Sequence, residues 1–215
     1  WDLLTSSRYG FGDHINVTQL DKWAFYAASR YCSAQDTRFG GTTDDYHPTP
    51  GRHGVPDGYG GYEPRFSCNA LLQTAEDAYK LINDLLSVLR CQGYWDSGSL
   101  TIAQDRPADP AYLFTLANVT SEGFSYTGGS LKTRPNVAVV AYTDIGRYDY
   151  INARWEDGLR DTAYEVVEDT EAIDKYGVVR TEVTAFACTS RGQANRLGRW
   201  LLYTERYGEV CSFSS

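Results

Sequence analysis

The stretch Val137–Thr143, VAVVAYT, is the part of the sequence that decides the fold. It begins with the longest uninterrupted apolar run, Val137–Tyr142, and its β-branched residues are typical of a strand that is covered on both faces. The run is much shorter than the ~20 residues that a membrane-spanning helix needs, so the sequence excludes membrane insertion. We expect a hydrophobic core to form around this strand.

The chain around this strand is expected to be rich in further strands. A short helix over Thr170–Tyr176 separates two of them and is stopped by Gly177. The strands predicted from apolar alternation are Tyr112–Leu116, Phe124–Thr127, Ala163–Glu168 and Val178–Ala187.

The last predicted helix begins after Ser190, which forms a capping box with Gln193, and runs to about Arg206. Gly198 in its interior costs about 1 kcal/mol relative to alanine. A glycine at that cost indicates a close backbone neighbour.

The first half of the chain is predicted to contain more helix. Two amphipathic helices are expected: residues 18–31, capped by Thr18 with Asp21, and residues 75–91, capped by Thr74 with Asp77 and ended by Gly93. A hairpin with the turn Asp96-Ser97-Gly98 follows, and residues 105–110 resemble a linker. The predicted fold class is α+β, with two mixed modules over residues 1–105 and 111–215, each a small, mainly antiparallel sheet with packed amphipathic helices.

Residues 40–62 show neither a helical nor a strand period. This stretch contains seven glycines and three prolines, with Tyr46, Tyr59 and Tyr62 between them. A long loop of this kind is either an element that docks on a partner through its tyrosines or a mobile loop, and the sequence leaves both open.

The composition argues against several classes of function. With 215 residues, of which 42% are hydrophobic and 22% charged, the chain is expected to fold. Its net charge of -8 disfavours a nucleic-acid reader, because binding to phosphates depends on basic side chains, although an acidic wall suits DNA that must pass without sticking. The start at Trp1 and the absence of methionine indicate a piece of a longer polypeptide.

Catalytic and metal-binding patterns are weak. The five cysteines are scattered and odd in number, which favours reduced thiols over a disulfide framework or a zinc site. No protease-like, deaminase-like or nucleotide-binding motif is present, and the pairing of Cys68 with His14 is only one of many that five cysteines and three histidines offer. We therefore expect no enzyme activity, no metal and no cofactor.

Positive charge gathers on the last predicted helix, which carries Arg191, Arg196, Arg199 and Arg206. These arginines either form a solvated face with local salt bridges or dock on the acidic surface of a neighbouring copy or partner. The sequence does not decide between the two.

Several strings, taken in order, resemble one known family. They are Arg8-Tyr9-Gly10-Phe11-Gly12, Glu63-Pro64-Arg65-Phe66-Ser67-Cys68-Asn69, Leu85-Leu86-Ser87, Asn118-Val119, Gly123-Phe124-Ser125-Tyr126, Tyr142-Thr143-Asp144, Thr189-Ser190-Arg191-Gly192-Gln193-Ala194 and Arg196-Leu197-Gly198-Arg199-Trp200. Together they are similar to the central part of the tail-tip host-specificity proteins of lambda-like siphophages.

This resemblance implies a structural role in the virion. Members form a trimeric hub that closes the distal end of the tail tube, contact other tail-tip proteins, and let DNA pass nearby, after assembly in the bacterial host cytoplasm. Receptor binding in the family belongs to regions further toward the C-terminus, and the family offers no catalytic residues. Two alternatives stay open: a cell-wall or glycan hydrolase module of a phage tail, and a glycan-binding module that uses the abundant tyrosines and tryptophans.

Overall fold

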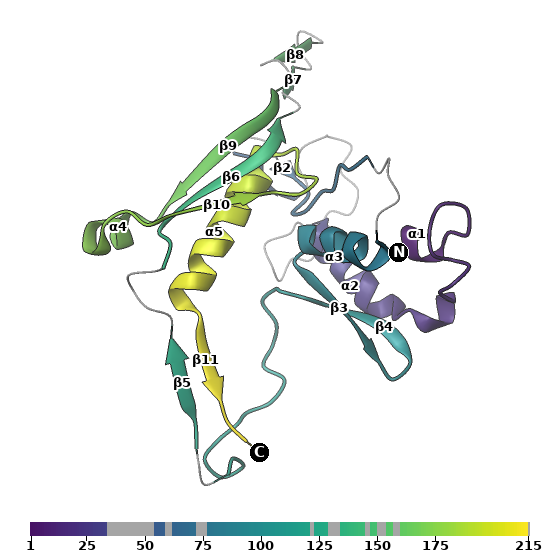
Figure 1. Cartoon of the computed structure of the whole chain (residues 1–215), viewed down its shortest axis with the longest axis horizontal. Helices are drawn as coiled ribbons and strands as arrows, with labels where there is room; N and C mark the ends of the chain where they lie inside the picture. Colours follow the sequence, from purple (N-terminus) through teal and green to yellow (C-terminus); the bar gives the residue numbers. More distant parts are fainter. Residues whose placement is uncertain are drawn as a thin grey trace. The chain divides into compact units, whose positions relative to one another are not determined.

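The computed structural model describes residues 1–33, 54–58, 62–71, 77–120, 123–128, 134–144, 147–149, 154–156 and 160–214 (Figure 1). The chain divides into two compact units: unit 1 comprises Trp1–Arg106 and Phe186–Cys188, and unit 2 comprises Pro107–Ala185 and Thr189–Ser215. Both contain helices beside small sheets, so the fold class is α+β, as predicted. Among the described strands, every pair is antiparallel except that of β6 with β10.

Strand β6 (Val137–Asp144) lies at the centre of unit 2. It pairs antiparallel with β9 (Arg160–Glu168) and parallel with β10 (Arg180–Thr184). The residues Val137 to Val140 are all buried, and two of them, Ala138 and Val140, are fully enclosed. The prediction of a core built on this strand is confirmed.

Helix α5 (Arg191–Tyr207) covers one face of this sheet. The Ser190 hydroxyl accepts a hydrogen bond from the Gln193 amide, which is half of the predicted capping box. A Cβ atom at Gly198 would lie 2.8 Å from Cγ2 of Val167 and 3.2 Å from Cγ2 of Val140. The close neighbours expected at this glycine are therefore two valine side chains of the sheet, and not backbone.

Helix α4 (Thr170–Tyr176) has the predicted bounds. The Asp169 side chain accepts from the Ala172 amide at its start, and Gly177, with φ of 76°, ends it. The buried Asn136 joins this turn to β6, because its amide donates to the Gly177 carbonyl and accepts from the Val179 amide. A small strand pair, β7 (Arg147–Asp149) with β8 (Arg154–Glu156), also belongs to this unit.

A two-stranded ribbon forms where α5 ends: β11 (Glu209–Ser212) pairs antiparallel with β5 (Ser125–Gly128). The sequence predicted β5 but not β11. The strand predicted over Tyr112–Leu116 is wrong, because Asn118 holds this segment in a turn: its Oδ1 accepts from the Thr115 amide, and its Nδ2 donates to the Leu113 carbonyl. The strand predicted over Val178–Ala187 is shorter and ends at Thr184.

Unit 1 begins with the short helix α1 (Asp2–Thr5) and the single turn η1 (Val17–Gln19). Helix α2 (Lys22–Cys32) starts later than predicted, since Asp21, and not Thr18, accepts from the first amides of the helix. A second short strand pair, β1 (Val55–Pro56) with β2 (Tyr62–Glu63), completes the part of unit 1 before α3.

Helix α3 (Ala78–Val88) is capped by Asp77, whose side chain accepts from the Lys80 amide. The predicted cap residue Thr74 lies outside the described residues. Gly93 does not end this helix: it lies inside β3 (Cys91–Asp96), where a Cβ atom would come within 2.9 Å of Leu86.

The predicted hairpin is present. Strand β3 pairs with β4 (Ser99–Gln104) through the two-residue turn Ser97-Gly98, in which both residues have positive φ (50° and 85°), as hairpin turns of this length require. The core of unit 1 consists of Ala28, Cys91 and Ile102, with Leu86 and Leu89 packed against it. No described helix combines the length and the apolar composition that crossing a membrane requires.

Candidate interaction surface

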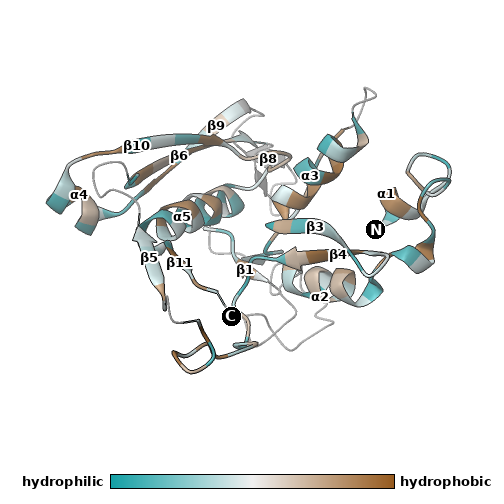
Figure 2. Cartoon of the chain, turned by 60° about the horizontal axis from the view of Figure 1, so that its bottom comes forward, coloured by the Kyte–Doolittle hydropathy of each residue, from teal (hydrophilic) through white to brown (hydrophobic). Residues whose placement is uncertain are grey.

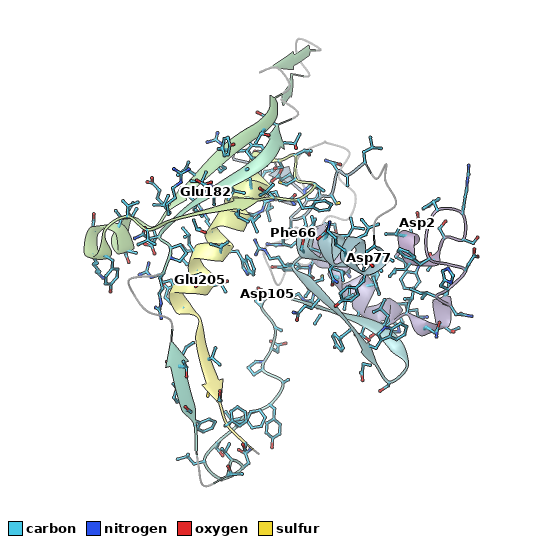
Figure 3. All side chains as sticks on the ribbon, in the orientation of Figure 1. Asp2, Phe66, Asp77, Asp105, Glu182 and Glu205 are labelled. Atoms are coloured by element: carbon cyan, nitrogen blue, oxygen red, sulfur yellow. The ribbon has the colours of Figure 1, made fainter. Side chains whose placement is uncertain are left out.

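The most extensive exposed apolar cluster of unit 2 lies on its two-stranded ribbon. We call strands β5 and β11, with residues 112–116 and Phe213, the aromatic ribbon. Its rings form a chain of contacts, with centroids 4.7 Å apart for Tyr112 and Phe114, 4.5 Å for Phe114 and Phe213, and 5.3 Å for Phe213 and Phe124. Figure 3 shows ring side chains gathered at the far end of the ribbon.

These side chains face solvent. The exposed fraction ranges from 38% for Phe213 to 78% for Leu116. The other exposed members are Tyr112, Leu113, Phe114, Tyr126 and Val210. Contiguous apolar patches of this kind mark interaction sites on soluble proteins, whereas single exposed apolar residues do not.

Local hydrogen bonds fix the shape of the ribbon. The Thr120 amide donates to the Ser214 carbonyl, and an Asn118 amide hydrogen bonds to the Tyr112 hydroxyl. Tyr126 lies opposite Cys211 across the strand pair, and charge on that thiol and a hydrogen bond to it raise the pKa of Tyr126. The rings are thus held in position before any partner arrives, which lowers the entropy cost of binding.

A second exposed surface is the side of the β6–β9–β10 sheet that faces away from α5. Strand register places Val139 beside Val166, and Ala141 beside Tyr164, on this side. Figure 2 shows α5 on the other side of the sheet, and no described element of unit 2 covers this one. We call it the open sheet face, which consists of Val137, Val139, Ala141, Tyr164, Val166, Glu168, Arg180, Glu182 and Thr184.

A polar groove of about 540 Å³ runs between α5, α4 and the end of β9. Arg206 donates there to Asp169 at 2.7 Å and to Glu171 at 2.9 Å, and the hydrogen bond to Glu171 is the main reason that the pKa of Arg206 is raised. Because this arginine is paired with two acids of its own unit, the groove offers no strong unpaired charge at that point.

The six predicted interface residues do not converge on one site. Arg199 is exposed and lines the polar groove, Arg196 is half-buried, and Arg191 binds Glu165 of its own unit at 2.7 Å. Tyr62 is exposed on β2, whereas Tyr46 and Tyr59 lie outside the described residues. The local salt-bridge interpretation describes Arg191, and docking through these residues stays a prediction.

Glu165 is the most enclosed member of an ion pair among the described residues. Only 9% of it is exposed, and its carboxylate accepts from Arg191 at 2.7 Å and from Asn195 Nδ2 at 2.8 Å. We expect Glu165→Ala to lower the free energy of unfolding by about 1–3 kcal/mol, because two charge-assisted hydrogen bonds are lost. Equilibrium denaturation of unit 2 measures this.

The matched control is Arg180→Ala. Arg180 pairs with Glu182 at 2.8 Å, but both side chains are more than half exposed, so this change should cost less than about 1 kcal/mol. Equal effects of the two substitutions would contradict the structural role of Glu165.

The groups considered for nucleophilic catalysis lie in unit 1. Cys68 and His14 are both exposed, and partial burial raises the pKa of the Cys68 thiol, which opposes formation of the thiolate that a cysteine nucleophile needs. Within the described residues, no three histidine, cysteine or acidic side chains gather as metal ligands would.

The five thiols should differ strongly in reactivity. Burial raises the pKa of Cys91 from 9.0 to about 12 and also raises the pKa of Cys32, while Cys188 is 2% exposed. At pH 8 we expect alkylation at exposed Cys211 and Cys68 first, with Cys91 roughly 1000-fold less ionised than a thiol of unshifted pKa. Peptide mapping of an alkylation time course measures this order.

The same shift has a consequence for stability. The neutral Cys91 thiol contributes its stabilisation below pH 9, and that contribution is lost as the pH rises towards 12. Modification of Cys91 as fast as Cys211 in the folded protein would contradict its burial.

Comparisons with known proteins agree on one type of protein. Residues 77–214 match a family described as "Putative phage tail protein". The chain is 35% identical over 215 residues to tip attachment protein J of Escherichia phage SECphi27, and 26% identical over 214 residues to tip attachment protein J of Escherichia phage SECphi4. These matches cover 100% and 99% of this chain but only 16% of each relative, so the chain spans about a sixth of their length.

Among solved structures, the 43 kDa tail protein of prophage MuSo2 from Shewanella oneidensis resembles 67% of this chain and 40% of its own, with a TM-score of 0.42 and 14% sequence identity.

Proposed function

This chain belongs to the phage tail protein family, and from that premise we propose that it forms part of a trimeric hub that closes the distal end of a siphophage tail tube. Its work is to present surfaces to sister subunits and to other tail-tip proteins. The observation that carries the proposal is the aromatic ribbon, whose exposed rings are preformed for contact.

The size of the ribbon patch supports a stable protein contact. Since a large aromatic side chain offers 150–250 Å² of surface, the exposed side chains of the ribbon together present roughly 700–800 Å². A specific protein interface of standard size buries about 800 Å² on each partner. The patch therefore corresponds to one side of one interface.

The acidic balance supports the passage of DNA. A net charge of -8 repels phosphates at long range, so DNA that moves through a ring of such subunits would not adhere to them. Assembly of the hub in the host cytoplasm suits its reduced cysteines.

The mass of the intact protein in solution tests the trimer. We expect three copies, measured by native mass spectrometry or light scattering. A monomer at micromolar concentration would contradict the hub.

The hydrolase alternative predicts a different result. It requires the protein to digest peptidoglycan and to lose that activity on Cys68→Ala or His14→Ala. We expect no digestion by the wild-type protein, because Cys68 carries a raised pKa and lies on an exposed segment.

One observation favours glycan binding as a second candidate. Trp23 and Tyr26 on α2 form an exposed ring pair with centroids 6.3 Å apart, and sugar rings stack on such faces. Quenching of tryptophan fluorescence by bacterial surface polysaccharide, lost on Trp23→Ala, would support this candidate.

A further inference from the structure

Unit 2 carries two separate apolar surfaces that its own described residues leave uncovered. One is the aromatic ribbon. The segment that supplies its loop, Ala111–Thr120, has ten residues without a charge, in a chain of which 22% is charged. Depletion of charge is a compositional mark of the centre of a protein interface.

The other is the open sheet face. Strand β6 is apolar on both sides, with Ala138 and Val140 towards α5 and Val137 and Val139 towards the open face. Strands of this composition are normally covered on both faces. Beside Val139 and Ala141, the neighbouring strand adds Val166 and Tyr164, which are 51% and 66% exposed. A second layer on this face would bury all four.

The ribbon of the same copy cannot supply that layer. Strand β11 continues α5 after only Gly208, and α5 packs on the opposite side of the sheet, where Gly198 meets Val140 and Val167. Figure 2 shows α5 and the ribbon on the same side of the sheet. To reach the open face, β11 would have to separate from the end of the helix.

We propose that the aromatic ribbon of one copy docks on the open sheet face of the next copy, so that a head-to-tail interface repeats around a ring. This inference rests on the proposed trimer and assigns its contact. A heterologous interface of this kind joins two different patches of each subunit and produces a closed ring when the rotation between neighbours closes. Each copy then covers both of its exposed surfaces through a single type of contact.

Charge supports a second copy of this chain as the occupant. Two copies with a net charge of -8 repel one another at long range, so they can associate only where few charges meet. The ribbon rings and the centre of the open face, Val139 and Val166, are uncharged, while Glu168, Arg180 and Glu182 lie along the outer strands of the sheet. Glu182 is labelled on β10 in Figure 3. This arrangement of an apolar centre with a polar rim is that of a protein interface.

A cross-link between the two surfaces tests the proposal. Cys211 is an exposed thiol on β11 and needs no engineering. In the intact protein, Cys68→Ser removes the other exposed thiol, and Val166→Cys places a new thiol on the open face. A short bis-maleimide should then join position 166 of one copy to Cys211 of the next, giving covalent dimers and trimers on a denaturing gel and none larger.

Two matched controls assign the link. Adding Cys211→Ser should abolish it, and replacing Val166→Cys by Tyr79→Cys, at an equally exposed position of α3, should give none. Peptide mapping identifies the joined residues.

The outcomes separate this inference from the proposed function. A trimeric wild-type mass without the link from position 166 to Cys211, or with Cys211 joined to Cys211, overturns the head-to-tail contact and leaves the hub standing. A monomeric wild-type protein overturns both.

Discussion

Gly198→Val should lower the free energy of unfolding of unit 2 by about 3 kcal/mol or more. A Cβ atom at this position would lie 2.8 Å from Val167 and 3.2 Å from Val140, and the two γ carbons of valine would reach further into the sheet. Valine is the better helix former by only a few tenths of a kcal/mol, which is too little to offset the overlap. Helix α5 would have to move away from β6 and β9.

Native-state hydrogen exchange measures this effect in the right place. We expect the amides of β6 and α5 to lose protection, while those of β3 and β4 in unit 1 keep theirs. The matched control is Glu205→Val, at an exposed position of the same helix that is labelled in Figure 3, where the same residue type is introduced without overlap. Similar exchange in the two variants would contradict the close packing of α5 on the sheet.

Asn136→Ala should destabilise unit 2 by about 2–4 kcal/mol. Asn136 is 3% exposed, and its side chain donates to the Gly177 carbonyl at 2.6 Å and accepts from the Val179 amide at 2.8 Å. Alanine leaves both of these backbone groups without that partner. We expect the turn after α4 and the start of β10 to open first, because they are tied to β6 through this side chain.

Thermal or chemical unfolding of the intact protein, followed at unit 2 by hydrogen exchange, tests this prediction. Asn83→Ala is the control: the Asn83 amide donates to the Tyr79 carbonyl on the exposed side of α3, and alanine is a better helix former. Asn136→Ala should cost stability and Asn83→Ala should not. A loss of under 0.5 kcal/mol at Asn136, which is the usual range for a surface substitution, would contradict its role.

The sequence predicts the elements that carry strong local signals. Strand β6 follows from its apolar run, α4 from Gly177, and the start of α5 from Ser190, because each signal acts within a few residues. The starts of α2 and α3 were displaced by a few residues, since Asp21 and Asp77 cap these helices and the sequence offers competing cap residues nearby.

The errors have a shared physical cause in long-range contacts. Gly93 resembles a helix stop, but it serves the approach of Leu86 to β3. Strand β11 lacks apolar alternation and forms because β5, more than eighty residues earlier, pairs with it. At Tyr112–Leu116 the alternation is present, but the Asn118 side chain takes the hydrogen bonds of the segment.

The candidate surface was predicted only in kind. The sequence indicates a contact-prone protein without catalytic motifs, yet it points to the tyrosines of residues 40–62 and to the arginines of α5 as contacts. The aromatic ribbon escaped because its rings come from three separate segments of the chain. The uncharged run Ala111–Thr120 is the one signal that could have indicated it.

An electron cryomicroscopy reconstruction of the intact phage tail tests the central claim most directly. We predict three copies of this region around the tail axis at the distal end, with the rings of each ribbon buried against the next copy. A region found in another copy number or away from the tail axis would contradict the account, as would a substrate held between Cys68 and His14.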